Sequence, residues 1–127
     1  MRKLFLASAL SLAALAAPAW AEDMIATDGL KASANSVTVG SVSAARSGYL
    51  VVHETADGTT AGTVIGHAPI KAGESTGVSI PLGKKVKAGA KLIVMLHSED
   101  DDDTDFDDAD KPVTSGRGPV VQIVTVQ

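Results

Sequence analysis

Three histidines and one dense acidic run are the side chains of this chain that are best suited to chemistry. His53 and His97 each stand at the end of a short apolar segment, Tyr49–Glu54 and Lys91–His97. If these segments are neighbouring strands that end alike, the two imidazoles lie close together. Imidazole nitrogen binds zinc and copper, so a nearby carboxylate would complete a candidate metal site. The candidate binding residues are His53, Glu54, His97, Asp100 and Asp110.

A structural role for the histidines is the alternative. No single segment carries the ligand spacing of a metal motif, and the chain has no cysteine, which excludes a blue-copper centre. On this interpretation His53 and His97 are partly buried histidines that are hydrogen-bonded at strand ends. The sequence leaves both interpretations open.

The acidic run extends over residues 99–110, where nine of twelve residues are Asp or Glu. Asp101, Asp103 and Asp105 alternate as the first ligands of a calcium loop do. However, Phe106 stands where such a loop needs glycine, and no glutamate occupies the bidentate position. The alternative is a solvated acidic loop at one end of the domain.

Catalytic motifs are absent from the sequence. It contains no nucleophile elbow, no phosphate-binding loop and no second histidine after His53-Glu54 that would complete a zinc-protease motif. We therefore expect a protein that is not an enzyme and that requires no cofactor.

Short valine-rich segments separated by Gly, Asp, Ser and Thr predict an all-β domain. Residues 36–42 alternate apolar and polar side chains, whereas 49–54 and 91–97 are apolar on both faces and predict central strands. Further strands are expected at 62–67, 77–82 and 120–126, with one more possible within 24–31. Six or seven strands favour an immunoglobulin-like antiparallel sandwich over a closed barrel.

The N-terminal segment has the features of a secretory signal. Arg2 and Lys3 precede an uncharged apolar run, and Ala19-Trp20-Ala21 is followed by acidic residues. We expect residues 1–21 to be a cleaved signal peptide, 22–32 an N-terminal arm or first strand, and 33–127 the sandwich domain. Without a cysteine there is no lipoprotein anchor, so the expected location is the periplasm or the exterior.

Charge and size restrict the partners. The whole chain carries a net charge of −4, and the signal segment holds two of its eleven basic residues and no acid, so the mature domain carries −6. A negative domain is a poor ligand for nucleic acid or anionic membranes. We expect a monomer with an ion or macromolecular ligand and no membrane span after cleavage.

The order of several short blocks resembles the domain of unknown function 7282, found in secreted and surface proteins of archaea and bacteria. The blocks cover about residues 33–126. They are Gly48-Tyr49-Leu50-Val51-Val52-His53-Glu54, Gly62-Thr63-Val64-Ile65-Gly66, Lys71-Ala72-Gly73, Leu92-Ile93-Val94-Met95-Leu96-His97 and Asp110-Lys111-Pro112-Val113. The resemblance implies an extracytoplasmic immunoglobulin-like sandwich without an assigned activity. The acidic run departs from the family pattern, which has glycines and an aromatic pair there.

Two hypotheses follow. The first is an exported, non-catalytic binding or interaction module. The second is a periplasmic protein that handles copper, zinc or calcium through the strand-end histidines or the acidic run.

Overall fold

The computed structural model describes residues 22–100, 105–107, 110–116 and 118–127 of the chain. These residues form β-strands and turns, and none of them is helical. Accordingly, the described part of the chain has no helix of the length and apolar character needed to cross a bilayer. The predicted signal peptide lies outside the described residues.

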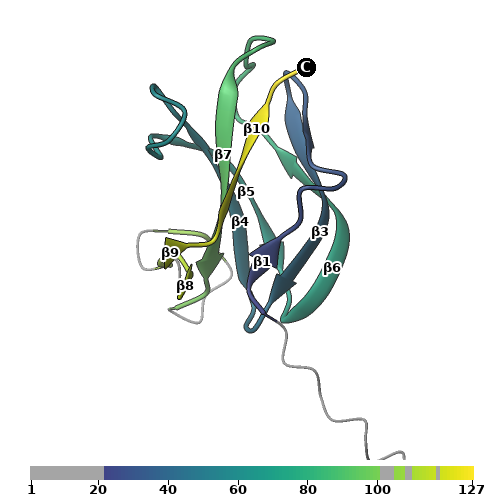
Figure 1. The fold of residues 1–127 in the computed structure, drawn as a ribbon, viewed down its shortest axis with the longest axis vertical. Helices are drawn as coiled ribbons and strands as arrows, with labels where there is room; N and C mark the ends of the chain where they lie inside the picture. Colours follow the sequence, from purple (N-terminus) through teal and green to yellow (C-terminus); the bar gives the residue numbers. More distant parts are fainter. Residues whose placement is uncertain (1–21, 101–104, 108–109, 117) are drawn as a thin grey trace, which may run out of the picture.

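Two antiparallel sheets pack face to face (Figure 1). Sheet A has the order β1-β3-β2, with β6 also paired to β3, and sheet B has the order β10-β7-β4-β5. The strands of sheet A are β1 (Met24–Ile25), β2 (Lys31–Ala32), β3 (Ser36–Ala44) and β6 (Gly73–Pro81). Those of sheet B are β4 (Gly48–Glu54), β5 (Val64–Ile70), β7 (Lys91–Ser98) and β10 (Val121–Thr125). A small ribbon joins β8 (Thr114–Ser115) and β9 (Gly118–Pro119). The predicted sandwich is therefore confirmed, and the barrel alternative is wrong.

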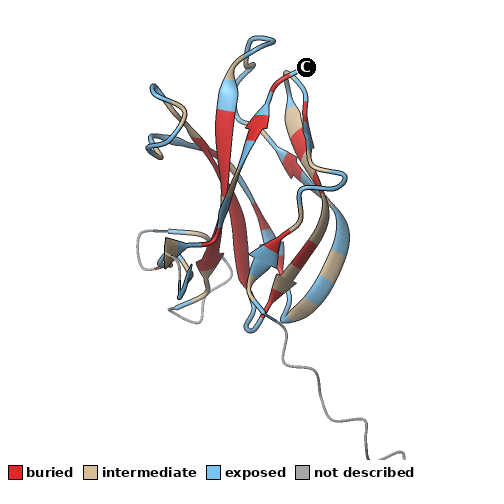
Figure 2. Ribbon diagram, in the orientation of Figure 1, coloured by how far each residue is buried: buried red, intermediate tan, exposed pale blue. Residues whose placement is uncertain are grey.

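Alternate residues of each long strand fill the space between the sheets. From sheet B, β4 contributes Leu50 and Val52, and β7 contributes Leu92, Val94 and Leu96. The core is almost wholly aliphatic, because the described residues contain only two aromatic side chains of the Phe, Tyr and Trp class. Figure 2 shows the buried residues along both sheets.

The two central strands of sheet B are also buried on their outer face. β7 lies between β10 and β4, and β4 lies between β7 and β5, as the two-faced apolar pattern predicts. Tyr49, Val51 and Ile93 belong to the outer face, yet their exposed fractions are 3%, 0% and 3%. Something beyond the sandwich must therefore cover this face, and it is there that the histidines lie.

Two glycines fix the frame around this face. A Cβ on Gly48 would overlap the carbonyl oxygen of His97, so only glycine lets β4 approach β7 at this position. Gly73 has a φ of 100°, a conformation that favours glycine, and it begins β6 directly after the chain leaves sheet B. Only residues 71 and 72 separate the two strands, so β5 and β6 occupy 64–70 and 73–81 instead of the predicted 62–67 and 77–82.

Candidate functional site

The histidine pair, His53 and His97, lies on the outer face of sheet B. The strands that carry them are neighbours, as expected, but they are antiparallel, so the condition that both end alike is not met. His97 is paired with Tyr49, four positions along β4 from His53, a separation of about 13 Å along the strand. The rings nevertheless meet, with centroids 5.8 Å apart and planes at 27°. The two side chains extend toward each other along the strands, over the cross-strand pair formed by Val51 and Met95, which lies between them.

Each imidazole is held through its Nδ1 atom. Nδ1 of His53 lies 3.0 Å from the carbonyl oxygen of Gly62, and Nδ1 of His97 lies 2.9 Å from that of Asp110. A carbonyl oxygen only accepts, so both Nδ1 atoms carry the hydrogen and donate it. In the neutral ring Nε2 is then left with a lone pair.

Both Nε2 atoms are buried and have no hydrogen-bond partner among the described residues. The two histidines are only 8% and 7% exposed. Buried polar atoms are nearly always paired, and leaving one unpaired costs about 1–3 kcal/mol. Two adjacent rings thus each keep one unpaired polar atom on the outer face of sheet B.

The pKa of His97 is shifted in the direction that leaves a lone pair on its Nε2 atom. Burial lowers the pKa of this imidazole below its ordinary value of 6.5, and the neighbouring His53 lowers it further. The hydrogen bond to the Asp110 carbonyl and the charges of Asp110 and Asp100 oppose this shift without reversing it. The surroundings of His97 therefore favour its neutral form, in which Nε2 carries a lone pair.

Phe106 of the acidic run packs against His97 and its neighbours on the outer face of sheet B. Its ring centroid lies 5.1 Å from that of His97, 5.5 Å from Tyr49 and 5.3 Å from His67. The hydroxyl of Tyr49 donates to a carboxylate oxygen of Glu99 at 2.6 Å. Glu99 and Phe106 thus pack on sheet B, whereas the sequence favoured a solvated loop.

Asp110 anchors the same segment. It is 3% exposed, and its carboxylate accepts the main-chain N–H groups of Asp100 and Asp107 at 3.0 and 2.9 Å. Burial opposes the charge, but these donors and His97 hold the pKa of the carboxyl below its usual value. Asp110 is thus used to close the loop and to orient His97 through its carbonyl.

The other predicted carboxylates have partners of their own. Asp100 accepts the N–H of Lys111 and the hydroxyl of Ser98, which hold its pKa below the usual value, and it lies 3.5 Å from Arg46. Among the described residues no third His, Cys, Asp or Glu joins the pair to form a metal-holding group. The described residues thus place two imidazole side chains together here without a third side chain of these types.

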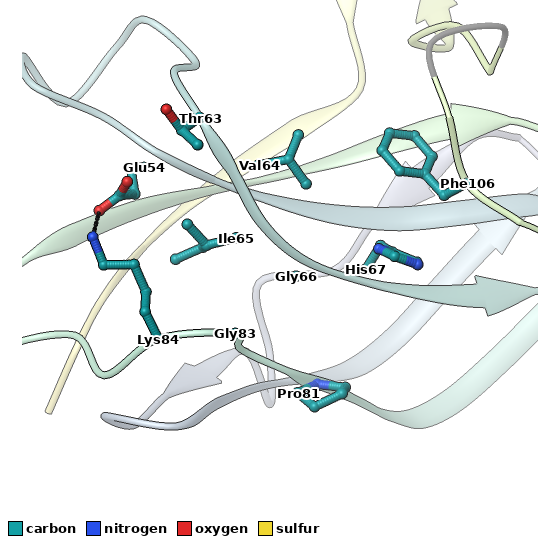
Figure 3. Close-up of a pocket in the computed structure, with 10 residues that line it drawn as sticks. All are labelled: Glu54, Thr63, Val64, Ile65, Gly66, His67, Pro81, Gly83, Lys84 and Phe106. Carbon is teal, nitrogen blue, oxygen red and sulfur yellow. Dashed lines mark hydrogen bonds and ion pairs between the residues drawn. The ribbon is translucent and has the colours of Figure 1, made fainter.

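Glu54 lines an open pocket beside β5 and is not part of the histidine pair. It forms an ion pair with Lys84 at 2.8 Å at one end of this pocket, which has a volume of about 800 Å³. Figure 3 shows the β5 side chains between this ion pair and the rings of His67 and Phe106 at the other end. Phe106 thus lines the pocket and also contacts His97, whereas His53 and His97 do not line the pocket.

The calcium hypothesis concerns residues that are mostly not described. Asp101 and Asp103 lie outside the described residues, and Asp105 is exposed. Phe106 and His67, by contrast, were not selected from the sequence. The only signal for Phe106 was that it is one of two Phe, Tyr or Trp residues after residue 21 and lies within an otherwise acidic run.

Comparison with known proteins identifies one family. The model of the family described as "Domain of unknown function (DUF7282)" matches residues 23–127. No curated protein and no solved structure matches the chain.

Proposed function

Because the chain belongs to the DUF7282 family, which is defined by a domain of unknown function, we propose its role from its own site: it is an exported, non-catalytic binding domain that takes up a metal ion at His53 and His97. The signal-like residues 1–21 support export. Mass spectrometry of the protein recovered from its host tests this part, and the expected N-terminus is Glu22.

The observation that carries the proposal is the pair of buried, unpartnered Nε2 atoms. Metal-binding histidines typically donate their other ring N–H to a carbonyl or carboxylate, which fixes the tautomer and the ring orientation. Both histidines already do this, toward Gly62 and Asp110. The rings are thus oriented as metal ligands are.

The ring separation fits a shared ion. An ion about 2 Å from each Nε2, with each nitrogen roughly 1 Å from its ring centroid, places the centroids at most about 6 Å apart. The observed separation is 5.8 Å. The Nδ1 atoms are bonded to carbonyls of two different loops, after β4 and after β7, and this leaves Nε2 of each ring available on the side away from its carbonyl.

The arrangement differs from that of a catalytic base. The charges of Asp100 and Asp110 act on His97 in the direction that favours a cation at the ring, although burial, the larger effect, lowers its pKa. Neither Nδ1 is bound to a carboxylate as the base of a catalytic triad is.

Thermal unfolding with added metal tests the proposal. A metal present at about 100 times its dissociation constant stabilises the folded state by about 2.7 kcal/mol, which raises Tm by roughly 10–20 °C in a domain of this size. The protein should carry no histidine tag, and copper and zinc salts should be tested separately.

Matched variants identify the site. His53→Asn and His97→Asn keep a side-chain N–H for the carbonyl but remove Nε2, so they should abolish the Tm shift. His67→Asn removes a histidine outside the pair and should retain it. An equal shift in all three variants would contradict the proposal.

The open pocket favours a second candidate, an organic ligand bound between the Glu54–Lys84 ion pair and Phe106. Amide chemical-shift changes confined to β5 during a screen of peptides and sugars would support it. A screen without such changes would remove it.

A further inference from the structure

Which metal the histidine pair takes follows from the number of its donors. The described residues offer two imidazole nitrogens and no third His, Cys, Asp or Glu. Zinc in proteins is almost always four-coordinate, and calcium takes six to eight oxygen ligands. Neither requirement is met by two nitrogens. A closed-shell monovalent ion such as copper(I) accepts two ligands in a nearly linear arrangement.

The apolar side chains around the two histidines also favour a soft ion of low charge. Val51 and Ile93 are buried on the same face, so an ion between the rings is largely removed from water. The penalty for burying an ion rises steeply with its charge, which disfavours a divalent cation here. Met95 lies in the row between the two histidines, and thioether sulfur is a donor that selects copper(I).

We propose, on the basis of the function proposed above, that the ion held between His53 Nε2 and His97 Nε2 is copper(I). Silver(I) has the same charge and the same preference for two ligands, and it is inert to oxidation. It is therefore the matched probe for the same site. The proposal concerns binding alone and requires no electron transfer by the protein.

Competition titrations test this assignment. Copper(I) is added without oxygen, in the presence of a colorimetric copper(I) chelator, and zinc(II) and copper(II) are titrated in parallel with suitable indicators. One copper(I) per chain is expected. His53→Asn and His97→Asn should each weaken copper(I) binding at least tenfold, while His67→Asn should leave it within twofold.

The outcomes separate the two proposals. Binding of zinc(II) or copper(II), but not copper(I), that depends on His53 and His97 would overturn the copper(I) assignment and leave the metal-binding function standing. Absence of any binding that depends on the pair would overturn both.

X-ray absorption of the copper(I)-loaded wild-type protein gives a readout that does not depend on variants folding. Two imidazole nitrogens at about 2 Å, alone or with one sulfur, would support the assignment. A shell of four nitrogen or oxygen atoms would overturn it.

Discussion

Phe106→Ala tests the packing of Phe106 on the outer face of sheet B. The ring is half-buried and makes three ring contacts, with Tyr49, His67 and His97. Full burial would make this substitution cost about 3–5 kcal/mol, so a half-buried ring should cost about 2 kcal/mol. In a domain of this size that corresponds to a Tm lower by roughly 8–16 °C.

The assay is thermal unfolding of the metal-free protein, followed by circular dichroism. Phe106→Leu is the control, because it keeps most of the apolar volume and loses only the ring contacts, so its Tm should lie between those of Phe106→Ala and the wild type. Loss of the cover should also bring water to His97 and move its pKa back toward 6.5, which an NMR titration measures. A Tm within about 2 °C of the wild type, together with an unchanged pKa, would refute the packing of Phe106 on this face.

Three further predictions concern the frame of the site and the turn that follows β4. Gly48→Ala should lower the unfolding free energy by at least about 3 kcal/mol or prevent folding, because the new Cβ overlaps a carbonyl of β7. The control Gly116→Ala, with open space around it, should change the unfolding free energy by less than about 0.5 kcal/mol. Equal effects of the two substitutions in urea melts would contradict this prediction. Asp110→Asn should lower Tm and speed hydrogen exchange at the two amides that its carboxylate binds, and unchanged exchange would count against the anchor. Main-chain N–H donors from Thr59 and Thr60 hold the pKa of Asp57 well below its usual 3.8, so its stabilising effect is present above that pH and is lost as the pH falls. Asp57→Asn should therefore flatten the fall of the unfolding free energy between about pH 5 and pH 2, and a slope equal to that of the wild type in urea melts would contradict it.

Local sequence patterns were sufficient to predict the sandwich. Strands β3, β4, β7 and β10 follow directly from the alternation or two-faced apolar character of their residues, because a strand places successive side chains on opposite faces. The same rule places His53 on one face with Tyr49 and His97 on one face with Ile93. The hypothesis that the two rings lie close together was correct. Because the strands are antiparallel, the two residues are four positions apart along the sheet, and their side chains have to extend toward each other to meet.

The cover of the site could not be predicted in this way. Phe106 and Glu99 meet Tyr49 across some fifty residues of chain, and no periodic pattern in an acidic run encodes such a contact. The burial of Asp110 has the same origin, since its carboxylate is stabilised by main-chain donors that only the folded loop brings together. The sequence shows charge there, but not which charges are hydrogen-bonded.

Metal binding by the histidine pair is tested most directly by the long-range ¹H–¹⁵N NMR spectrum of the three imidazoles during titration with silver(I). His53 and His97 should both carry hydrogen on Nδ1 in the metal-free protein. One equivalent of silver(I) should then shift both Nε2 resonances together and leave His67 unchanged. An Nε2-protonated tautomer at either histidine of the pair, or a titration that moves His67 alone, would contradict metal binding by this pair.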